Sequence, residues 1–314
     1  MNTNQNKKLI LTGANGFVGS YIARSFSDSG YEITAVVRNK NSDISLLKGI
    51  NNIQIVFCDL DSIEDLPQIL SHKNYDLFLH FAWEASAGAD RSNTAIQLKN
   101  VEATCKAVKA AKELHCNRFV FAGSIMTYEA KEYVLNNNST PSPTYIYSTA
   151  KLTASMMAKI TAVEQNIEYI NVVISNIYGI GERSMRFLNS TIHKIISGTT
   201  ELNLTSCEQI YDFIYASDAA QAIKTASLYG ENLSSFYIGN REQYPLKKFI
   251  LDIKDALNST VTINFGAVEF NGAYFDYHDI IDTNKLSELG FKPRISFKEG
   301  IKILAVNIMK APRQ

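Results

Sequence analysis

The sequence has little that would direct the chain to a membrane or a nucleic acid. No apolar run reaches the length of about 20 residues that spans a bilayer. The first residues, MNTNQNKK, lack the apolar core of a signal peptide. The 31 Lys and Arg residues balance the 31 Asp and Glu residues, so no net charge attracts an anionic surface. The sequence therefore predicts a cytoplasmic protein with no nucleic-acid and no membrane partner.

Cysteine is scarce as well, and no internal repeat or low-complexity tract is present. The four cysteines, at positions 58, 105, 116 and 207, form no pair at metal-ligand spacing. We expect thiols in a reducing compartment and no metal site. With 46% hydrophobic and 20% charged residues, the 314-residue chain is typical of a globular protein with one large domain or two.

The most informative stretch is KKLILTGANGFVGS, at Lys7–Ser20. An apolar run leads into three glycines, and an amphipathic segment follows. In a strand, turn and helix of this kind, the first glycine makes the turn, the second lets a phosphate approach the backbone, and the third allows helix and strand to pack. The helix N-terminus adds free N–H groups for a pyrophosphate. The stretch predicts a dinucleotide site formed by Gly13, Asn15, Gly16, Phe17, Val18 and Gly19.

Five further strand-like runs predict the fold class. They lie at residues 31–37, 52–57, 76–81, 117–122 and 172–174. Their alternation with helical patterns is typical of a doubly wound parallel sheet, the Rossmann arrangement, with helices on both faces. We expect a dinucleotide-binding domain at residues 1–176. The pattern then changes to a helix at 185–196, a strand pair within 202–213, and helices at 217–229 and 297–309. These predict a smaller α+β substrate-binding lobe at residues 177–314, from which segments near 205–240 return to the first domain.

The residues that close the strands are candidates for cofactor contacts, because ligands bind at the carboxyl ends of such strands. Arg38 closes the second strand, where an acidic side chain would bind the ribose 2′-hydroxyl of NAD. Arg38 could instead pair with a 2′-phosphate, which favours NADP(H) over NAD(H); a solvated loop arginine is the alternative. His80 lies inside an apolar run and is interpreted as a core histidine. The other candidates are Asp59 and Leu60 after the third strand, and Phe81, Ala82 and Trp83 after the fourth.

A helical segment at residues 144–160 carries Tyr147 and Lys151 four residues apart, so phenol and ammonium can face one cleft. An ammonium one turn away stabilises the phenolate, which an acid/base tyrosine needs. Ser124, at the end of the fifth strand, and Asn100, in the preceding long helix, come in the right order for one site. A second Tyr-x-x-x-Lys match begins at Tyr244, as chance predicts among 16 tyrosines. The proline after it favours a surface helix.

These motifs together resemble the extended short-chain dehydrogenase/reductases of the NAD-dependent epimerase/dehydratase family. The resemblance rests on TGANGFVG, CDL, Asn100, Ser124 ahead of Tyr128, YSTAK and NIYGIG, in that order. Within the family the chain is similar to nucleotide-sugar 4-ketoreductases such as the CDP-abequose synthases, through HFAW, EQIYDFIYASDAAQA, FGAVE and LSELGFKPRISFKEGI.

The resemblance implies NADPH-dependent reduction of the 4-keto group of a nucleoside-diphosphate 4-keto-6-deoxy sugar, in the synthesis of surface polysaccharides. Tyr147 would be the acid/base, Lys151 would hold the nicotinamide ribose, and Ser124 would bond the reacting oxygen. It also implies a homodimer with a four-helix interface, consistent with apolar residues on more than one face of the helices at 93–115 and 147–160.

Two positions depart from the family pattern. Tyr211 and Val173 stand where the family commonly has arginines, the first of which usually grips the sugar-nucleotide pyrophosphate. Arg183 or Arg186 could substitute as phosphate partners, or either could be a solvated charge. The expected substrate-binding residues are Ser124, Met126, Asn176, Arg183, Arg186 and Tyr211.

Four other functions stay open beside the reductase. A 4,6-dehydratase would carry an Asp-Glu pair just after the serine, where Ile125 and Met126 stand instead. A 4-epimerase uses the same catalytic residues with tightly held NAD, and Arg38 argues against it. A redox-inactive binding protein is disfavoured by the intact Ser124, Tyr147 and Lys151. A reductase of a non-nucleotide carbonyl compound fits the missing arginine better. Thermal protection by UDP, CDP, GDP or dTDP would distinguish the last case.

Overall fold

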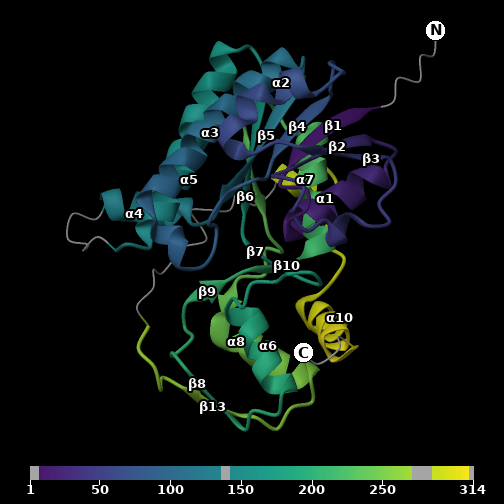
Figure 1. Ribbon diagram of the computed structural model, residues 1–314. Helices are drawn as coiled ribbons and strands as arrows, with labels where there is room; N and C mark the ends of the chain where they lie inside the picture. The colour runs from purple at the N-terminus through teal and green to yellow at the C-terminus, as the bar shows by residue number, and fades with distance from the viewer. Residues whose placement is uncertain (1–6, 136–141, 271–284, 311–314) are drawn as a thin grey trace.

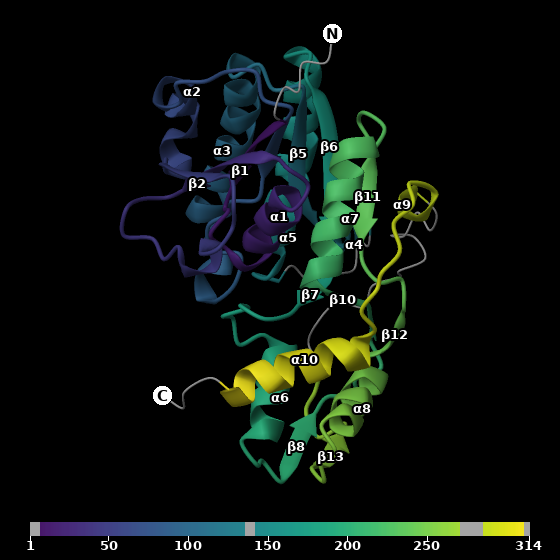
Figure 2. The ribbon, with the colours of Figure 1, turned by 90° about the vertical axis from the view of Figure 1, so that its right-hand side faces the viewer.

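The computed structural model describes residues 7–135, 142–270 and 285–310. Figures 1 and 2 show a layered part that contains a large sheet and a smaller lobe beside one end of it. Over the described ranges, no helix is long and apolar enough to cross a membrane, and no group of three or more His, Cys, Asp or Glu residues could hold a metal. The prediction that the chain has no signal peptide rests partly on residues 1–6, which lie outside these ranges.

The large sheet has seven strands, all parallel, in the order β11-β6-β5-β4-β1-β2-β3. Successive residues of β1 point to opposite faces, so Leu9 and Leu11 enter one core while Ile10 enters the other. The predicted Rossmann fold class is therefore confirmed. The strands are β1 (Lys8–Thr12), β2 (Glu32–Val37), β3 (Ile53–Phe57), β4 (Leu77–His80), β5 (Arg118–Ser124), β6 (Glu168–Ile174) and β11 (Ser235–Ile238).

Helices cover both faces of this sheet. On one face lie α1 (Phe17–Ser27) and α7 (Ala216–Tyr229). On the other face lie α2 (Leu66–Ile69), α3 (Thr94–Glu113) and α5 (Tyr145–Glu164). Because helices cover both faces and exclude water from them, the strands carry apolar residues on both sides, as parallel strands do. The remaining elements of this part are η1 (Ser45–Leu47), η2 (Leu60–Asp65), η3 (Ala89–Ser92), α4 (Thr127–Leu135) and α9 (Lys285–Glu288).

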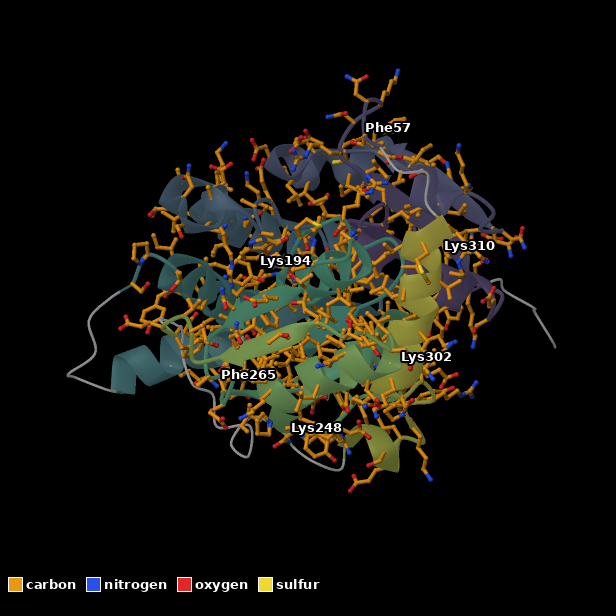
Figure 3. All side chains as sticks on the ribbon, turned by 90° about the horizontal axis from the view of Figure 1, so that it is seen from below. Phe57, Lys194, Lys248, Phe265, Lys302 and Lys310 are labelled. Carbon is orange, nitrogen blue, oxygen red and sulfur yellow. The ribbon has the colours of Figure 1, made fainter. Side chains whose placement is uncertain are left out.

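The smaller lobe has its own core of aromatic rings. Phe249 packs against Phe213 and Phe297 with ring centroids 5.0 and 4.8 Å apart. Figure 3 shows the lobe from below, with Lys302 and Lys310 on its last helix. Its elements are β7 (Asn176–Tyr178), α6 (Phe187–Ile196), β8 (Glu201–Leu204), β9 (Ile210–Tyr211), β10 (Phe213–Tyr215), β12 (Tyr244–Pro245), α8 (Leu246–Ala256), β13 (Thr262–Phe265) and α10 (Phe297–Lys310).

One expectation for this lobe is wrong. The strands within residues 202–213 do not pair with each other: β8 pairs with β13, β9 with β12, and β10 with β7. The partners of these strands are 30 to 60 residues away, roughly, and a local pattern carries no information about such distant pairing. The pairing of β10 with β7 has a consequence for the site, because it ties the lobe to the chain that leaves β6 at the edge of the large sheet.

Candidate active site

The glycine turn has the geometry that the sequence predicts. Gly13 has a φ of +68°, and a Cβ there would lie 2.7 Å from the backbone nitrogen of Ala82. A Cβ on Gly19 would lie 2.1 Å from the carbonyl oxygen of Gly13. Gly16 forms the N-cap of α1, and a Cβ there would meet only that carbonyl, at 3.2 Å. The backbone is thus packed behind the turn and open in front of it, which fits a phosphate group at the N-terminus of α1.

A cavity of about 760 Å³ opens in front of this turn. It runs between the ends of β1, β2 and β4 and the first residues of the lobe, including Gly181 and Arg186. Its size and its glycine cradle fit a dinucleotide. Most of the predicted cofactor residues line it, namely Gly13, Asn15, Gly16, Phe17, Val18, Gly19, Arg38, Leu60, Phe81, Ala82 and Trp83. Four other predicted cofactor residues are not among its lining residues, namely Asp59, Asn100, Tyr147 and Lys151.

Arg38 lies at the end of β2, between two carboxylates. Its Nε is 3.9 Å from an Asp59 oxygen, and a terminal nitrogen is 3.5 Å from a Glu84 oxygen. All three side chains are about half exposed. Asp59 also accepts a hydrogen bond from the backbone N–H of Asp61 at 3.2 Å. A 2′-phosphate that bound Arg38 would therefore compete with these two acids, a feature that the sequence did not reveal.

Asn100 holds the loop that follows β4. Its amide donates to the carbonyl of Glu84, and its oxygen accepts from the Glu84 N–H, both at 2.9 Å. One turn earlier on α3, Gln97 accepts a hydrogen bond from the Trp83 indole at 2.9 Å and donates to the Ala85 carbonyl at 3.1 Å. The helix thereby fixes the course of residues 83–85 beside the cavity.

Ser124, Tyr147 and Lys151 come together as the sequence predicts. All three are buried, with side chains from the end of β5 and from one face of α5. Hydrogen bonding from the Ser124 side chain lowers the pKa of the Tyr147 phenol. The Ser124 hydroxyl oxygen accepts a bond from the backbone N–H of Met126 at 3.2 Å. The hydroxyl proton of Ser124 is thus directed to the phenol or to a substrate oxygen beside it.

Lys151 makes other contacts than the sequence suggested. Its ammonium donates to the carbonyl of Ala122 at 3.0 Å and lies 3.7 Å from the centre of the Trp83 ring. Burial lowers the pKa of Lys151 from 10.5 to about 7. The Trp83 ring in turn meets Tyr147 edge to face, with centroids 6.2 Å apart. The indole therefore lies between the lysine and the cofactor cavity that it lines.

Burial raises the pKa of Tyr147, which keeps the phenol protonated at neutral pH. Three groups oppose this effect: the hydrogen bond from Ser124, and the positive charges of Arg91 and Arg186. Arg91 is a residue that sequence reasoning missed. It lies in η3, in a loop without periodicity or motif, and its guanidinium carbon is 4.3 Å from the centre of the Tyr147 ring. Only its position shortly after a strand end could have drawn attention to it.

His80 is a core residue, as predicted. It is buried, and its Nδ1 is 3.0 Å from the Thr12 hydroxyl. Burial, together with the lysine charge, lowers the His80 pKa to about 3, so the imidazole is neutral. The second Tyr-x-x-x-Lys match lies far from these groups in the lobe. Tyr244 and Lys248 are exposed there, and Lys248, which is labelled in Figure 3, pairs with Asp252 at 2.6 Å.

The expected substrate residues have different surroundings. Arg186 lines the cavity and acts on Tyr147. Arg183 also lines the cavity but binds Asp43 of the loop after β2, so its charge is already paired. The Asn176 amide donates to the Asp212 carbonyl at 3.1 Å. Tyr211 stacks on a phenylalanine of the lobe core, with centroids 5.5 Å apart. The structure thus places Arg186 at the cavity, where its charge lowers the pKa of Tyr147, and leaves Tyr211 within the lobe.

Known proteins resemble the chain over nearly its whole length. A dTDP-4-dehydro-6-deoxyglucose reductase from Escherichia coli is 27% identical, over 96% of this chain and 97% of the relative. A CDP-abequose synthase from Salmonella muenchen is 25% identical, over 95% and 96% of the two chains. Among solved structures, a UDP-N-acetylglucosamine 4-epimerase from Methanobrevibacter ruminantium has the same fold, with a TM-score of 0.80 at 20% identity over 98% of this chain and 99% of that one.

A family model gives the assignment. The model described as "NAD dependent epimerase/dehydratase family" matches residues 9–239, from β1 to the end of β11. The matched part includes the glycine turn and the buried Ser124, Tyr147 and Lys151. The chain belongs to the NAD dependent epimerase/dehydratase family and is an NAD(P)-dependent enzyme.

Proposed function

We propose that the protein reduces the 4-keto group of a nucleoside-diphosphate 4-keto-6-deoxy sugar with NADPH. The observation that carries this proposal is that buried Tyr147 and Lys151 both contact the ring of Trp83, which lines the dinucleotide cavity. Two relatives found over nearly the whole chain are named as a reductase of such a sugar and as a CDP-abequose synthase. The glycine turn would hold the pyrophosphate, and Arg38 would meet the 2′-phosphate.

The residues of the site suit the protonation step of such a reduction. The bound dinucleotide supplies the hydride. Tyr147 donates its proton to the carbonyl oxygen as negative charge develops there, and its raised pKa keeps that proton in place at neutral pH. Ser124 donates a hydrogen bond to the same oxygen, because its own oxygen is already engaged by the Met126 N–H. Burial of both side chains excludes water from the transfer.

We further propose a division of labour between the two parts of the chain. Residues 1–176, joined by β11 and α7, would bind the dinucleotide, and the rest of residues 177–314 would bind the sugar nucleotide. Arg186 supports this division because it extends from the lobe into the cavity and acts on Tyr147. With Tyr211 in the place of the family arginine, Arg186 is the candidate partner for a substrate phosphate.

A homodimer is part of the proposal. Helix α5 packs on the sheet through a stripe of alanines, including Ala154 and Ala158. On its other side, Met156, Ile160 and Val163 lie at helical spacing and are each 58 to 59% exposed. Leu98 on the neighbouring α3 is 61% exposed. An apolar stripe of this kind on two adjacent helices suits a four-helix contact with a second copy.

A 4-epimerase is the second candidate, and one observation favours it. Asp59 and Glu84 flank Arg38, so acidic oxygens stand near the position of the adenosine ribose, as in NAD-selective sites. An epimerase would retain NAD through purification, and Tyr147 would remove and return the same proton. A reductase of a non-nucleotide carbonyl compound stays a third possibility, given Tyr211.

The test combines NADPH with dTDP-4-keto-6-deoxyglucose or its CDP counterpart and follows the absorbance of NADPH at 340 nm. We expect consumption that stops in the Tyr147→Phe variant. Turnover of UDP-glucose or UDP-N-acetylglucosamine by protein that carries tightly bound NAD would establish the epimerase instead. Melting temperatures with UDP, CDP, GDP and dTDP add an independent readout, and no protection by any of them would point to a non-nucleotide substrate.

A further inference from the structure

Arg91 lies directly over the reactive phenol. Its guanidinium carbon is 4.3 Å from the centre of the Tyr147 ring, inside the range of a cation–π contact. Its Nε is buried and has no hydrogen-bond partner. A buried hydrogen-bond donor without a partner costs free energy. We therefore expect another interaction, here the contact with the ring, to favour this position of the Arg91 side chain.

The loop that carries Arg91 is held in place from α3. The Asn100 side-chain amide bonds both the backbone N–H and the backbone carbonyl of Glu84. Gln97 bonds the Trp83 indole and the Ala85 carbonyl. The Arg91 N–H closes the following turn on the Gly88 carbonyl at 3.3 Å. These contacts anchor the backbone that leads into η3, and so they place Arg91 where its side chain reaches the Tyr147 ring.

Charged and titratable groups approach this pair from every element around it. Arg91 comes from η3, Lys151 from α5 itself, and Arg186 from the lobe. The Lys151 ammonium, however, is directed to the Ala122 carbonyl and the Trp83 ring. His80 of β4 is neutral because burial and the Lys151 charge lower its pKa, and Glu129 of α4 is a buried carboxyl whose pKa the charge of Arg91 lowers in part.

We propose that Arg91 is a positioning residue for Tyr147: its guanidinium holds the phenol ring from one face and stabilises negative charge on it. The inference rests on the proposed role of Tyr147 as the acid/base. A phenolate ring is richer in electrons than a phenol, so a cation on its face favours the charged form. Arg91 thereby supplies part of the stabilisation of the phenolate that the family resemblance assigns to Lys151 alone.

The decisive experiment observes Tyr147 itself and needs no substrate. Protein labelled with [ζ-¹³C]tyrosine is titrated upward from pH 8 to the highest pH at which the protein stays folded, and the Tyr147 signal is assigned by its loss in Tyr147→Phe. In Arg91→Gln, we expect the titration midpoint of Tyr147 to rise by about 0.5 to 1. Arg91→Lys, which keeps the charge, should restore part of the difference. Melting temperatures confirm that each variant is folded.

Arg24→Gln is the matched control, because Arg24 acts on another phenol, Tyr21. It should leave the Tyr147 midpoint unchanged. An unchanged midpoint in folded Arg91→Gln, or an equal rise in Arg24→Gln, overturns the proposal. Failure of this proposal for Arg91 is distinct from failure of the proposed function, in which Tyr147 is the acid/base. The latter failure would appear as full reduction of dTDP-4-keto-6-deoxyglucose by the Tyr147→Phe variant. Where that reduction proceeds, the limb of its pH profile that reports Tyr147 should move upward in Arg91→Gln by the same amount.

Discussion

We expect Lys151 to lower the stability of the fold at neutral pH, and the variant Lys151→Met measures by how much. The ammonium has a pKa of about 7 in the folded protein, against 10.5 when exposed. At pH 7 this difference destabilises the fold by about 4 kcal/mol, at about 1.36 kcal/mol for each pKa unit. The methionine side chain lacks the hydrogen bond to the Ala122 carbonyl and the cation–π contact with Trp83. Together these two interactions stabilise the fold by about 2 to 3 kcal/mol. We expect the variant to be about 1 to 2 kcal/mol more stable at pH 7.

The pH dependence of this gain gives the sharper test. Between pH 7 and 9.5 the unfolded chain binds more protons at Lys151 than the folded protein, so the stability that this lysine contributes rises with pH. The advantage of Lys151→Met should therefore shrink by about 3 kcal/mol over that interval. Urea unfolding of both proteins without nucleotide, at the two pH values, measures it. Lys99→Met, at a lysine exposed on α3, is the control and should show no such change. A constant difference between the Lys151 variant and the parent would refute the reasoning.

The remaining predictions concern the proposed activity and assembly. Tyr147→Phe should lower turnover by roughly 100-fold or more while NADPH affinity persists, and Tyr244→Phe should change neither; steady-state kinetics with dTDP-4-keto-6-deoxyglucose decides. Arg38→Ala should raise the KM for NADPH far more than that for NADH, and equal affinities in the unmodified protein would contradict the assignment. A glutamate at both Met156 and Ile160 should convert a dimer to monomers in light scattering at micromolar concentration, and a parent protein that is already monomeric would exclude this interface.

The sequence predicts the sheet well because its signals are local. The glycine turn needs Gly13 at positive φ and no side chain on Gly19, and both requirements are visible in the residue types themselves. The alternation of apolar strands and helices then specifies a parallel arrangement. The pairing of β8 with β13 could not be predicted, because strand partners about 60 residues apart leave no mark on either segment alone.

The candidate site shows the same division. The spacing of Tyr147 and Lys151 predicts one helical face, and the structure confirms that both are buried there. The spacing does not predict which groups the Lys151 ammonium contacts. That depends on Trp83, a bulky residue at the end of β4, and on the Ala122 carbonyl of the next strand. Arg91 escapes detection for a similar reason, since only the fold brings its loop over the tyrosine.

Four of the cations in or near the cavity fall into two groups with different partners. Arg38 and Arg183 contact carboxylates, and such a cation can bind a phosphate only if the phosphate displaces or shares that acid. Lys151 and Arg91 contact aromatic rings, which attract a cation without cancelling its charge. Around Tyr147, Arg91 therefore keeps its charge, as does Lys151 in the fraction that stays protonated at its pKa of about 7. An alkoxide or phenolate gains most from charge placed there in advance, because a preorganised cation needs no rearrangement as the anion forms. On this argument, the chemistry of the site depends on the ring-bound pair, whereas the choice between NADPH and NADH depends on how readily Arg38 leaves Asp59 and Glu84.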